Sequence, residues 1–268
     1  MKPIKIKNFV IAKAKKFTPA QIKNSLRGLR DLFYYIIYSG KRRLCPVCGR
    51  RFRKFGTFGL DPRANAKCLK CGSLERHRLV WLYFSRMTDL FDEKPKEVLH
   101  IAPETCFAKR LKNKIGNGYI TADLNDPKAM IRMDITDIHY PDEYFDVIYC
   151  SHVLEHVIDD IAAIREFHRV LKKSGWAIIL VPIEKEKTFE NFSIKDPRER
   201  LKVFGQEDHV RIYGEDFEDR LKKGGFKTKV IAAPEFLNED EMIKMGITTA
   251  SGKIYYCTKL NPPPRKNN

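Results

Sequence analysis

The stretch DITDIHYPDEYFDVIYCSHVLEHV, residues 134–157, decides the fold of this 268-residue chain. Its apolar run from Phe145 to Tyr149 predicts a buried strand, and polar residues follow the run directly. Asp159 can cap a helix after this stretch, and the end of that helix is predicted from three residues, Lys172, Lys173 and Gly175. The apolar face of the helix comprises Ile161, Ile164, Phe167 and Leu171. A strand, a helix and a second strand at residues 176–181 predict one unit of a parallel sheet.

The same pattern extends on both sides of this unit, so we expect an α/β fold over residues 96–260. The candidate strands are residues 98–101, 119–121, 131–133, 145–149, 176–181, 226–231 and 253–257. Four shorter segments complete the predicted organisation. They are a basic amphipathic helical extension at 1–43, a cysteine module at 44–72, a bridging helix at 73–95 and a disordered tail at 261–268.

Four cysteines in the module have the spacing of a metal site. Cys45 and Cys48 form one C-x2-C pair, and Cys68 and Cys71 form a second pair nineteen residues later. This spacing predicts a zinc ribbon in which four thiolates hold one structural Zn²⁺, a closed site without catalytic chemistry. Two disulfides would need an oxidising compartment, and a redox dithiol would need only one pair.

The quoted stretch, together with RVLKKSGW at residues 169–176, resembles the class I S-adenosylmethionine-dependent methyltransferases, most closely their small-molecule type 11 branch. The resemblance covers residues 96–259. It implies a Rossmann-like, seven-stranded methyltransferase sheet flanked by helices, with S-adenosylmethionine as the cofactor. The zinc ribbon and the basic extension would then be additions at the N-terminal side.

The resemblance also implies a set of cofactor residues at the carboxyl ends of the strands. Asp123 takes the place of the acidic residue that holds the ribose, although a turn aspartate is the alternative because Asn125, Asp126 and Pro127 follow it. Asp134 and Ile135 match the positions at the adenine. Near the methionine end, the matching residues are Cys150, Ser151 and His152.

The turn after the first strand departs from the family pattern. Its three usual glycine places hold Ala102, Glu104 and Cys106, and His100 replaces an acidic residue. Loss of those glycines could narrow the cofactor site. Pro103 could set an alternative turn, and Glu104 could reach the cofactor's ammonium, so Ala102, Pro103 and Glu104 are retained as candidate cofactor residues.

Two histidines are candidate general bases for removing a proton from a methyl acceptor. His152 is placed by the resemblance at the pocket mouth, where a wall residue without chemistry is the alternative; Glu155 could orient it, and His156 is expected to pack on the sheet. His209 belongs to a second polar group, for which a charged surface loop without chemistry is the alternative. The substrate candidates in that group are Gln206, His209, Arg211 and Tyr213, with Arg211 as an anion clamp. Residues 185–200 could form a lid.

The charge of the chain points to a polyanionic partner. The net charge is +17, and residues 1–72 hold 19 Lys and Arg but only Asp31 and Asp61 as acidic residues, whereas the other 196 residues carry 32 of each sign. RNA, an anionic membrane surface or a phosphorylated carrier fits this asymmetry, and a solvated basic face is the alternative. Residues 33–38 are apolar and too few to span a bilayer, but they could anchor at its interface or pack on the protein.

These patterns favour a methyltransferase for a small-molecule or carrier-linked acceptor, such as a sugar or glycan. The alternatives are an RNA methyltransferase that docks RNA on the basic ribbon, and a non-catalytic zinc-ribbon binding protein. An Asn-Pro-Pro-Tyr type of sequence does not follow the fourth strand, which argues against DNA amine methylation, and Cys150 is expected to be a buried structural thiol. With no transmembrane or signal segment evident, we expect a cytoplasmic protein, peripheral at the membrane if residues 33–38 anchor it. The oligomeric state stays open.

Overall fold

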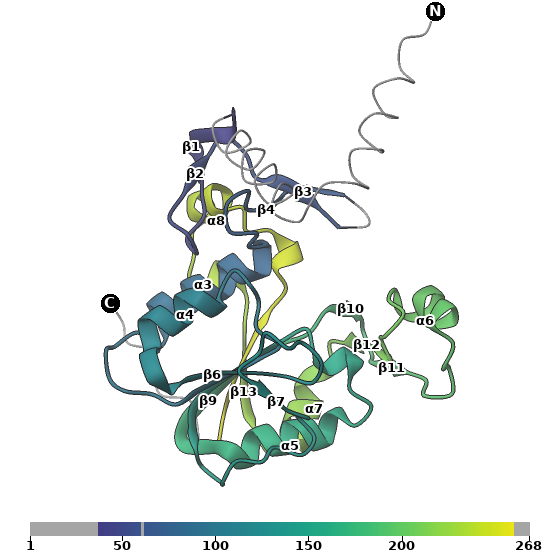
Figure 1. The fold of residues 1–268 in the computed structure, drawn as a ribbon. Coiled ribbons are helices and arrows are strands. Elements are labelled where there is room, and N and C mark those ends of the chain that lie inside the picture. The colour runs from purple at the N-terminus through teal and green to yellow at the C-terminus, as the bar shows by residue number, and fades with distance from the viewer. Residues whose placement is uncertain (1–36, 60–61, 260–268) are drawn as a thin grey trace, which may run out of the picture.

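The computed structural model describes residues 37–59 and 62–259. A seven-stranded sheet in the order β13-β14-β9-β8-β5-β6-β7 forms its centre (Figure 1). β14 runs antiparallel to both of its neighbours, whereas the other pairs are parallel. The strands are β5 (Val98–Ile101), β6 (Tyr119–Asp123), β7 (Ile131–Arg132), β8 (Phe145–Ser151), β9 (Leu171–Leu180), β13 (Lys227–Ile231) and β14 (Ile254–Thr258). The predicted α/β fold is confirmed, and every strand overlaps its predicted range.

Helices cover both faces of this sheet, as Figure 1 shows. Residues of β8 alternate between the two layers: Val147 and Tyr149 pack with the core around α3 (Glu75–Met87) and α4 (Ala108–Ile115). Ile148 and Cys150 pack with the core around α5 (Asp160–Val170) and α7 (Phe217–Lys223). A strand buried on both faces needs apolar residues at successive positions, which explains the apolar run from Val147 to Cys150 in β8.

The helix after β8 begins as expected but ends earlier. Asp159 caps α5 by accepting a hydrogen bond from the backbone N–H of Ala162 at 2.9 Å. We expected Lys172, Lys173 and Gly175 to end the helix, but α5 ends at Val170 and these residues belong to β9. The physical reason is pairing and space: Leu171 is paired with Phe145, and a Cβ at Gly175 would lie 2.7 Å from the carbonyl oxygen of Asp146.

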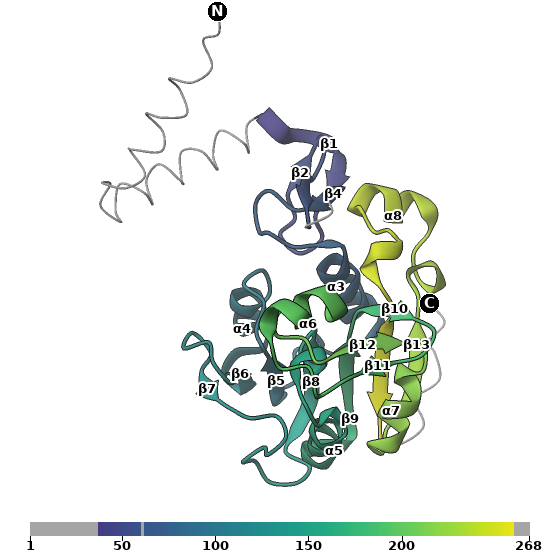
Figure 2. The ribbon, with the colours of Figure 1, turned by 90° about the vertical axis from the view of Figure 1, so that its right-hand side faces the viewer.

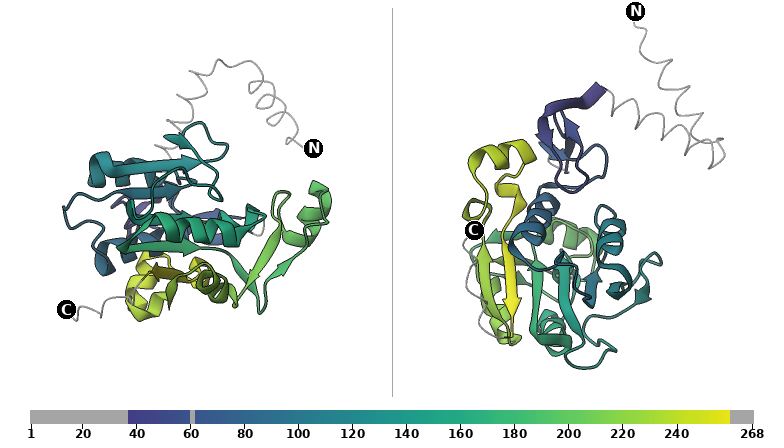
Figure 3. Two further views of the ribbon diagram at one scale, coloured as in Figure 1. Left: turned by 90° about the horizontal axis from the view of Figure 1, so that it is seen from below. Right: turned by 90° about the vertical axis from the view of Figure 1, so that its left-hand side faces the viewer.

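A polar insertion follows β9 and projects away from the sheet (Figures 1 and 3). It contains β10 (Ile183–Lys185), β11 (Phe189–Glu190), α6 (Pro197–Phe204) and β12 (Arg211–Gly214), with the strands in the order β10-β12-β11. Four 3₁₀ helices complete the described chain, η1 (Gly116–Gly118), η2 (Leu154–His156), η3 (Ala233–Glu235) and η4 (Thr249–Ser251). The lid role of residues 185–200 stays a prediction.

The cysteine module consists of two hairpins, β1 (Ser39–Leu44) with β2 (Arg51–Phe52) and β3 (Gly56–Phe58) with β4 (Arg63–Lys67). α8 (Glu239–Met245) lies beside it in Figure 2. Cys45 and Phe52 belong to the same buried core as the α3 face of the sheet. The module is therefore packed onto the main fold through α3 and α8.

Two predicted segments fall largely outside the described residues. The basic extension is described only from residue 37, and the tail at 261–268 lies outside the description entirely. Within residues 37–59 and 62–259, no helix is long and apolar enough to cross a membrane.

Candidate functional site

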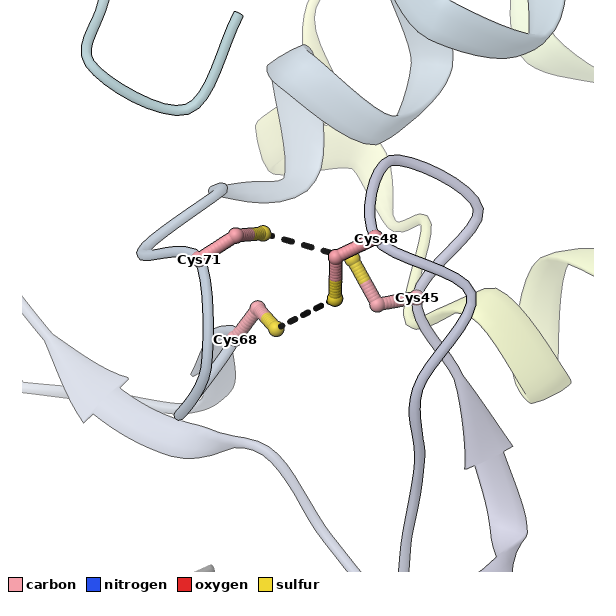
Figure 4. A group of neighbouring side chains, drawn as sticks. All are labelled: Cys45, Cys48, Cys68 and Cys71. Carbon is pink, nitrogen blue, oxygen red and sulfur yellow. Dashed lines mark hydrogen bonds between the residues drawn. The ribbon is translucent and has the colours of Figure 1, made fainter. Parts of the chain in front are cut away.

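Four cysteine thiols converge in the N-terminal module (Figure 4). All four Sγ atoms lie within 4.8 Å of one another, and the Cys45–Cys71 and Cys48–Cys68 distances are both 3.7 Å. A tetrahedral site with Zn–S bonds of about 2.3 Å separates its sulfurs by about 3.8 Å. The thiols are free and not paired as disulfides. Their arrangement therefore fits one four-coordinate Zn²⁺.

The backbone of each C-x2-C pair explains how its thiols converge. Gly49 donates its N–H to the carbonyl of Cys45 at 2.8 Å, and Gly72 donates to the carbonyl of Cys68 at 2.9 Å. The φ angles of these glycines are 70° and 77°, in the left-handed region that glycine enters without a Cβ clash. Each pair thus closes a tight turn from which both sulfurs reach the centre.

The turn after β5 keeps the conformation of a glycine turn without the glycine. Ala102 has a φ of 47°, and its N–H donates to the carbonyl of Ala122 at 2.8 Å. An L-residue in this left-handed region costs about 1–2 kcal/mol. Glu104 and Cys106, in the other two usual glycine places, do not have positive φ angles. The substitutions therefore preserve the turn at a moderate conformational cost.

Glu104 is the centre of a buried polar network on the α3 side of the sheet. Its carboxylate lies 2.6 Å from Nε2 of His100 and accepts a hydrogen bond from the hydroxyl of Tyr149 at 2.9 Å. The hydroxyl of Tyr119 lies 2.6 Å from Nδ1 of His100. Burial acts to raise the pKa of Glu104, but the hydrogen bond with His100 and the charges of His100 and His77 outweigh it and lower the pKa to about 2. Glu104 is therefore ionised at neutral pH.

Two buried polar atoms near this network lack a hydrogen-bond partner among the described residues. They are Nε2 of His77, which is 3.7 Å from Glu104, and Oγ of Ser151 at the end of β8. The N–H of Leu74 donates to Nδ1 of His77 at 3.0 Å, so the ring proton of the neutral side chain lies on Nε2. Burial lowers the pKa of His77 to about 4. Two hydrogen-bond donors and an ionised carboxylate thus suit a ligand that carries both a carboxylate and an ammonium.

The predicted ribose and adenine residues lie at the ends of β6 and β7. Oδ1 of Asp123 accepts hydrogen bonds from the N–H groups of Asn125 and Asp126, both at 2.7 Å, as expected for a turn aspartate. Oδ1 of Asp134 accepts from the N–H of Thr136, and this hydrogen bond is the main cause of its lowered pKa. Ile135 is buried in the core. These contacts account for one carboxylate oxygen of each aspartate, and the cofactor roles stay predictions.

A cavity of about 780 Å³ opens at the carboxyl ends of β8, β9 and β13. His152 lies in its wall beside residues 180–184, and Arg63 and Arg76 contribute from the cysteine module and α3. Nε of Arg76 is buried and has no partner in the described part of the chain. His152 has a φ of 56°, a strained conformation that costs on the order of 1–3 kcal/mol and is typical of functional sites.

The structure joins the two groups of histidines that are far apart in the sequence. Nδ1 of His152 lies 3.3 Å from Oε1 of Glu155. The rings of His156 and His209 are 4.6 Å apart, and the N–H of Val210 donates to the carbonyl of Glu155 at 3.0 Å. The loop after β8 and the insertion therefore form one polar cluster, with His152 on the cavity side.

The other substrate candidates in the insertion serve the fold. The Arg211 side chain is fully buried, and its guanidinium donates to the carbonyls of Leu154, Val157 and Ile158 and to Glu190. These four hydrogen bonds within the fold argue against the predicted anion-clamp role of Arg211. The Tyr213 hydroxyl is also buried and donates to Asp160 at 2.7 Å.

The predicted substrate residues of the insertion do not line the cavity that His152 lines. Gln206 is exposed on the insertion. Among the described residues, the lining of the cavity includes His152 but none of Gln206, His209, Arg211 and Tyr213. His152 therefore lies in the wall of this cavity and His209 does not, and the general-base role of each stays a prediction. Cys150 is fully buried, and burial raises its pKa, as expected for a structural thiol.

Sequence reasoning missed the contribution of α3 to the site. Glu75, Arg76, His77 and Arg78 are consecutive polar residues at the start of a helix that is otherwise largely apolar. Three of the four are buried, and Arg76 lines the cavity. Such a polar run at the start of a buried helix is the signal that could have indicated a functional role.

Residues 85–179 match the model of the family Methyltransf_11, described as a methyltransferase domain. The match runs from the end of α3 into β9 and so includes Ala102, Asp123, Asp134 and His152. A search of curated proteins found no match to the chain.

Solved structures with a similar fold include three methyltransferases at low identity. An S-adenosylmethionine-dependent methyltransferase from Mesorhizobium loti is 13% identical, with 67% of this chain and 97% of that chain covered and a TM-score of 0.47. One from Thermotoga maritima is 20% identical over 69% and 98%, with a TM-score of 0.41. A 1,6-didemethyltoxoflavin-N1-methyltransferase from Burkholderia thailandensis is 12% identical over 72% and 87%, with a TM-score of 0.41.

The family match and the order of the seven strands together confirm the predicted fold and enzyme class. Over residues 85–179 the chain therefore matches a methyltransferase domain.

Proposed function

We propose that the protein methylates a small-molecule or carrier-linked acceptor whose reactive end enters the 780 Å³ cavity. The observation that carries this proposal is the position of the cavity. It lies at the carboxyl ends of β8 and β9, where open α/β sheets bind their ligands, and its volume suits a small molecule or a terminal sugar. The unpartnered Nε of Arg76 would donate to an acceptor oxygen, and an anionic or oxygen-rich acceptor such as a glycan fits this wall.

The cofactor would lie beside the cavity, over the ends of β5, β6 and β8. Glu104 would accept from its ammonium, while His77 and Ser151 would donate to its carboxylate. Asp123 would hold the ribose through Oδ2, since Oδ1 is used by the turn, and Asp134 and Ile135 would flank the adenine. When bound, S-adenosylmethionine supplies a methyl group on a positively charged sulfur.

His152 is the proposed general base for an acceptor hydroxyl. Its side chain is partly exposed in the cavity wall, and Glu155 is placed to orient one ring nitrogen so that the other can accept a proton. The carboxylate partner would also stabilise the imidazolium that forms. This role requires a cavity-side acceptor and does not depend on His209.

RNA is the second candidate acceptor, because the described part of the cysteine module is strongly basic. Exposed cationic side chains on and beside the β1–β2 hairpin are Lys41, Arg42, Arg50, Arg51, Arg53 and Lys54. Phosphate contacts by such residues would make binding fall steeply with salt. An anionic membrane would be distinguished by binding to vesicles and not to RNA.

Calorimetric titration with S-adenosylmethionine and S-adenosylhomocysteine tests the cofactor site. Asp123→Asn is the informative variant, because the amide oxygen can still accept the two turn hydrogen bonds while the carboxylate charge is lost. We expect at least tenfold weaker binding, with an unchanged melting temperature. Asp126→Asn, in the same loop, is the control.

The outcomes test the role of Asp123 and distinguish the proposed function from its two alternatives. Binding that Asp123→Asn leaves unchanged would remove the ribose role. Absence of binding by the wild type would favour a non-catalytic zinc-ribbon protein. Methyl transfer to RNA, but not to small or carrier-linked acceptors, would favour the RNA reading.

A further inference from the structure

Glu155, His156 and His209 form a compact group outside the cysteine module. Glu155 and His156 belong to η2, and His209 comes from the insertion between α6 and β12. Their ligand atoms lie within 4.8 Å of one another. The hydrogen bond from Val210 to Glu155 and the guanidinium of Arg211 fix the two segments together. The group is therefore held by ordered backbone contacts.

The group contains buried polar atoms whose bonding capacity is unused. Glu155 is 1% exposed, and its Oε2 has no hydrogen-bond partner within the part of the chain that the structure describes. His209 is 6% exposed, and the same holds for its Nε2. A buried carboxylate oxygen without a hydrogen-bond partner is destabilising. Two such unpartnered atoms within one group of neighbouring ligand residues indicate a ligand that accepts their lone pairs.

A second carboxylate and a third imidazole contact the group from outside, as the groups around metal ligands commonly do. Oδ2 of Asp208 lies 3.1 Å from Nδ1 of His156, and Nδ1 of His152 lies 3.3 Å from the other carboxylate oxygen of Glu155. A carboxylate on one imidazole nitrogen fixes the tautomer and leaves the lone pair on the other nitrogen.

We propose that Glu155, His156 and His209 bind a divalent transition-metal ion, separately from the four-cysteine site. Two imidazoles and one carboxylate suit ions such as Zn²⁺, Fe²⁺, Co²⁺ or Ni²⁺. Metal–ligand bonds of about 2.0–2.2 Å would place the ligand atoms about 3.4 Å from one another. The ligand atoms, which now lie within 4.8 Å of one another, would therefore have to approach by about 1 Å. Three protein ligands would leave a coordination position open, in contrast to the closed thiolate site.

A metal ion at this place would bind the loop after β8 to the insertion. Because His152 lies on that loop and in the cavity wall, the ion would also hold the cavity side of the loop in position. The site goes beyond the proposed methyl transfer and does not depend on it. Metal binding is therefore measured directly and not through activity.

The test is a Co²⁺ titration of the full chain after one equivalent of Zn²⁺ has filled the cysteines. We expect a second equivalent to bind with weak visible absorption and without the intense thiolate-to-metal charge-transfer band, and to raise the melting temperature. His209→Asn and Glu155→Gln should each weaken this binding at least tenfold. His139→Asn is the matched control, because the His139 side chain is 87% exposed and lies outside the group.

His156→Asn keeps the test decisive if His209→Asn does not fold, since the His156 side chain is partly exposed and its replacement leaves the core intact. Loss of the second equivalent in His156→Asn, with the zinc content of the cysteines unchanged, would support the site. A total of one metal per chain would overturn it. So would a second ion that binds through thiolates or that all the histidine variants retain.

Discussion

Arg78 joins three parts of the chain, so its replacement should destabilise the whole protein. Its guanidinium donates to the carbonyls of Ala66, in the cysteine module, and of Ser73, directly after the module, at 2.9 Å each. It also donates to the carbonyls of Met245 and Gly246, at the end of α8, at 2.6 and 2.7 Å. The residue lies on α3 and is 0% exposed. One side chain thus satisfies four backbone acceptors that are far apart in the sequence.

The expected loss in Arg78→Ala follows from these four acceptors. Each buried carbonyl that loses its donor costs about 1–3 kcal/mol, although water entering the vacated space would satisfy some of them. The guanidinium also lies 4.3 Å from the centre of the Phe55 ring, a cation–π contact of about 1–2 kcal/mol when buried. We therefore expect a loss of about 4–6 kcal/mol in the free energy of unfolding, a large share of the 5–15 kcal/mol typical of a domain.

Urea unfolding of the zinc-loaded protein measures this loss, with Arg86→Ala as the control on the same helix. Arg86 is partly exposed and pairs with Glu241 at 2.8 Å, so its removal should lower the free energy of unfolding by about 0.5 kcal/mol. Arg78→Lys should fall between them, because one ammonium cannot reach four carbonyls in a fork geometry. A loss below about 1.5 kcal/mol in Arg78→Ala, with zinc retained, would refute the reasoning.

Three further predictions concern the cysteines, the β5 turn and the buried carboxylate. Cys45→Ser and Cys71→Ser should lose the single structural zinc, measured by metal analysis, and unfold at lower temperature; a folded wild type without metal would contradict the site. Ala102→Gly should raise the free energy of unfolding by up to about 1 kcal/mol, measured in urea, because it relieves a φ of 47°; a loss of stability would show that this conformation carries no strain. The pKa of Glu104 is lowered to about 2 from 4.5, so its contribution to stability is present above pH 4.5 and lost as the pH falls towards 2. In Glu104→Gln, the loss of unfolding free energy between pH 4.5 and pH 2 should be smaller by about 3 kcal/mol than in the wild type, measured by unfolding at a series of pH values. An unchanged pH profile would contradict this expectation.

The sheet was predictable because its signals are local. β8 is apolar from Val147 to Cys150 and β9 from Trp176 to Leu180, and Asp159 caps α5 where the apolar period changes from strand to helix. The end of α5 was not predictable in the same way. Lys172 and Gly175 are typical of a helix end, but the pairing of Leu171 with Phe145 decides that they extend β9, and this pairing depends on tertiary structure.

The site was predicted less completely, because its parts come from distant segments. The cysteine spacing was sufficient to predict that the four thiols converge, since each pair closes its own turn. In contrast, the contact between Glu155 and His209 depends on how the insertion folds back, and a polar sequence such as Gln206 to Tyr213 does not show which side chains face inward. Arg211 illustrates this: the residue type fits an anion clamp, but its burial makes it a structural donor.

The altered turn after β5 does not by itself argue against cofactor binding. A glycine is needed only where the backbone enters the left-handed region or where a Cβ would block the ligand. Ala102 enters that region and remains there, and the residue in the second usual glycine place, Glu104, uses its side chain to build the network with His100 and Tyr149. This network creates an ionised carboxylate beside the unpartnered Nε2 of His77. If the cofactor binds as proposed, the turn would replace close backbone approach with a charged contact, and recognition of the amino-acid end of the cofactor should depend on Glu104 and His77 more than on the missing glycines.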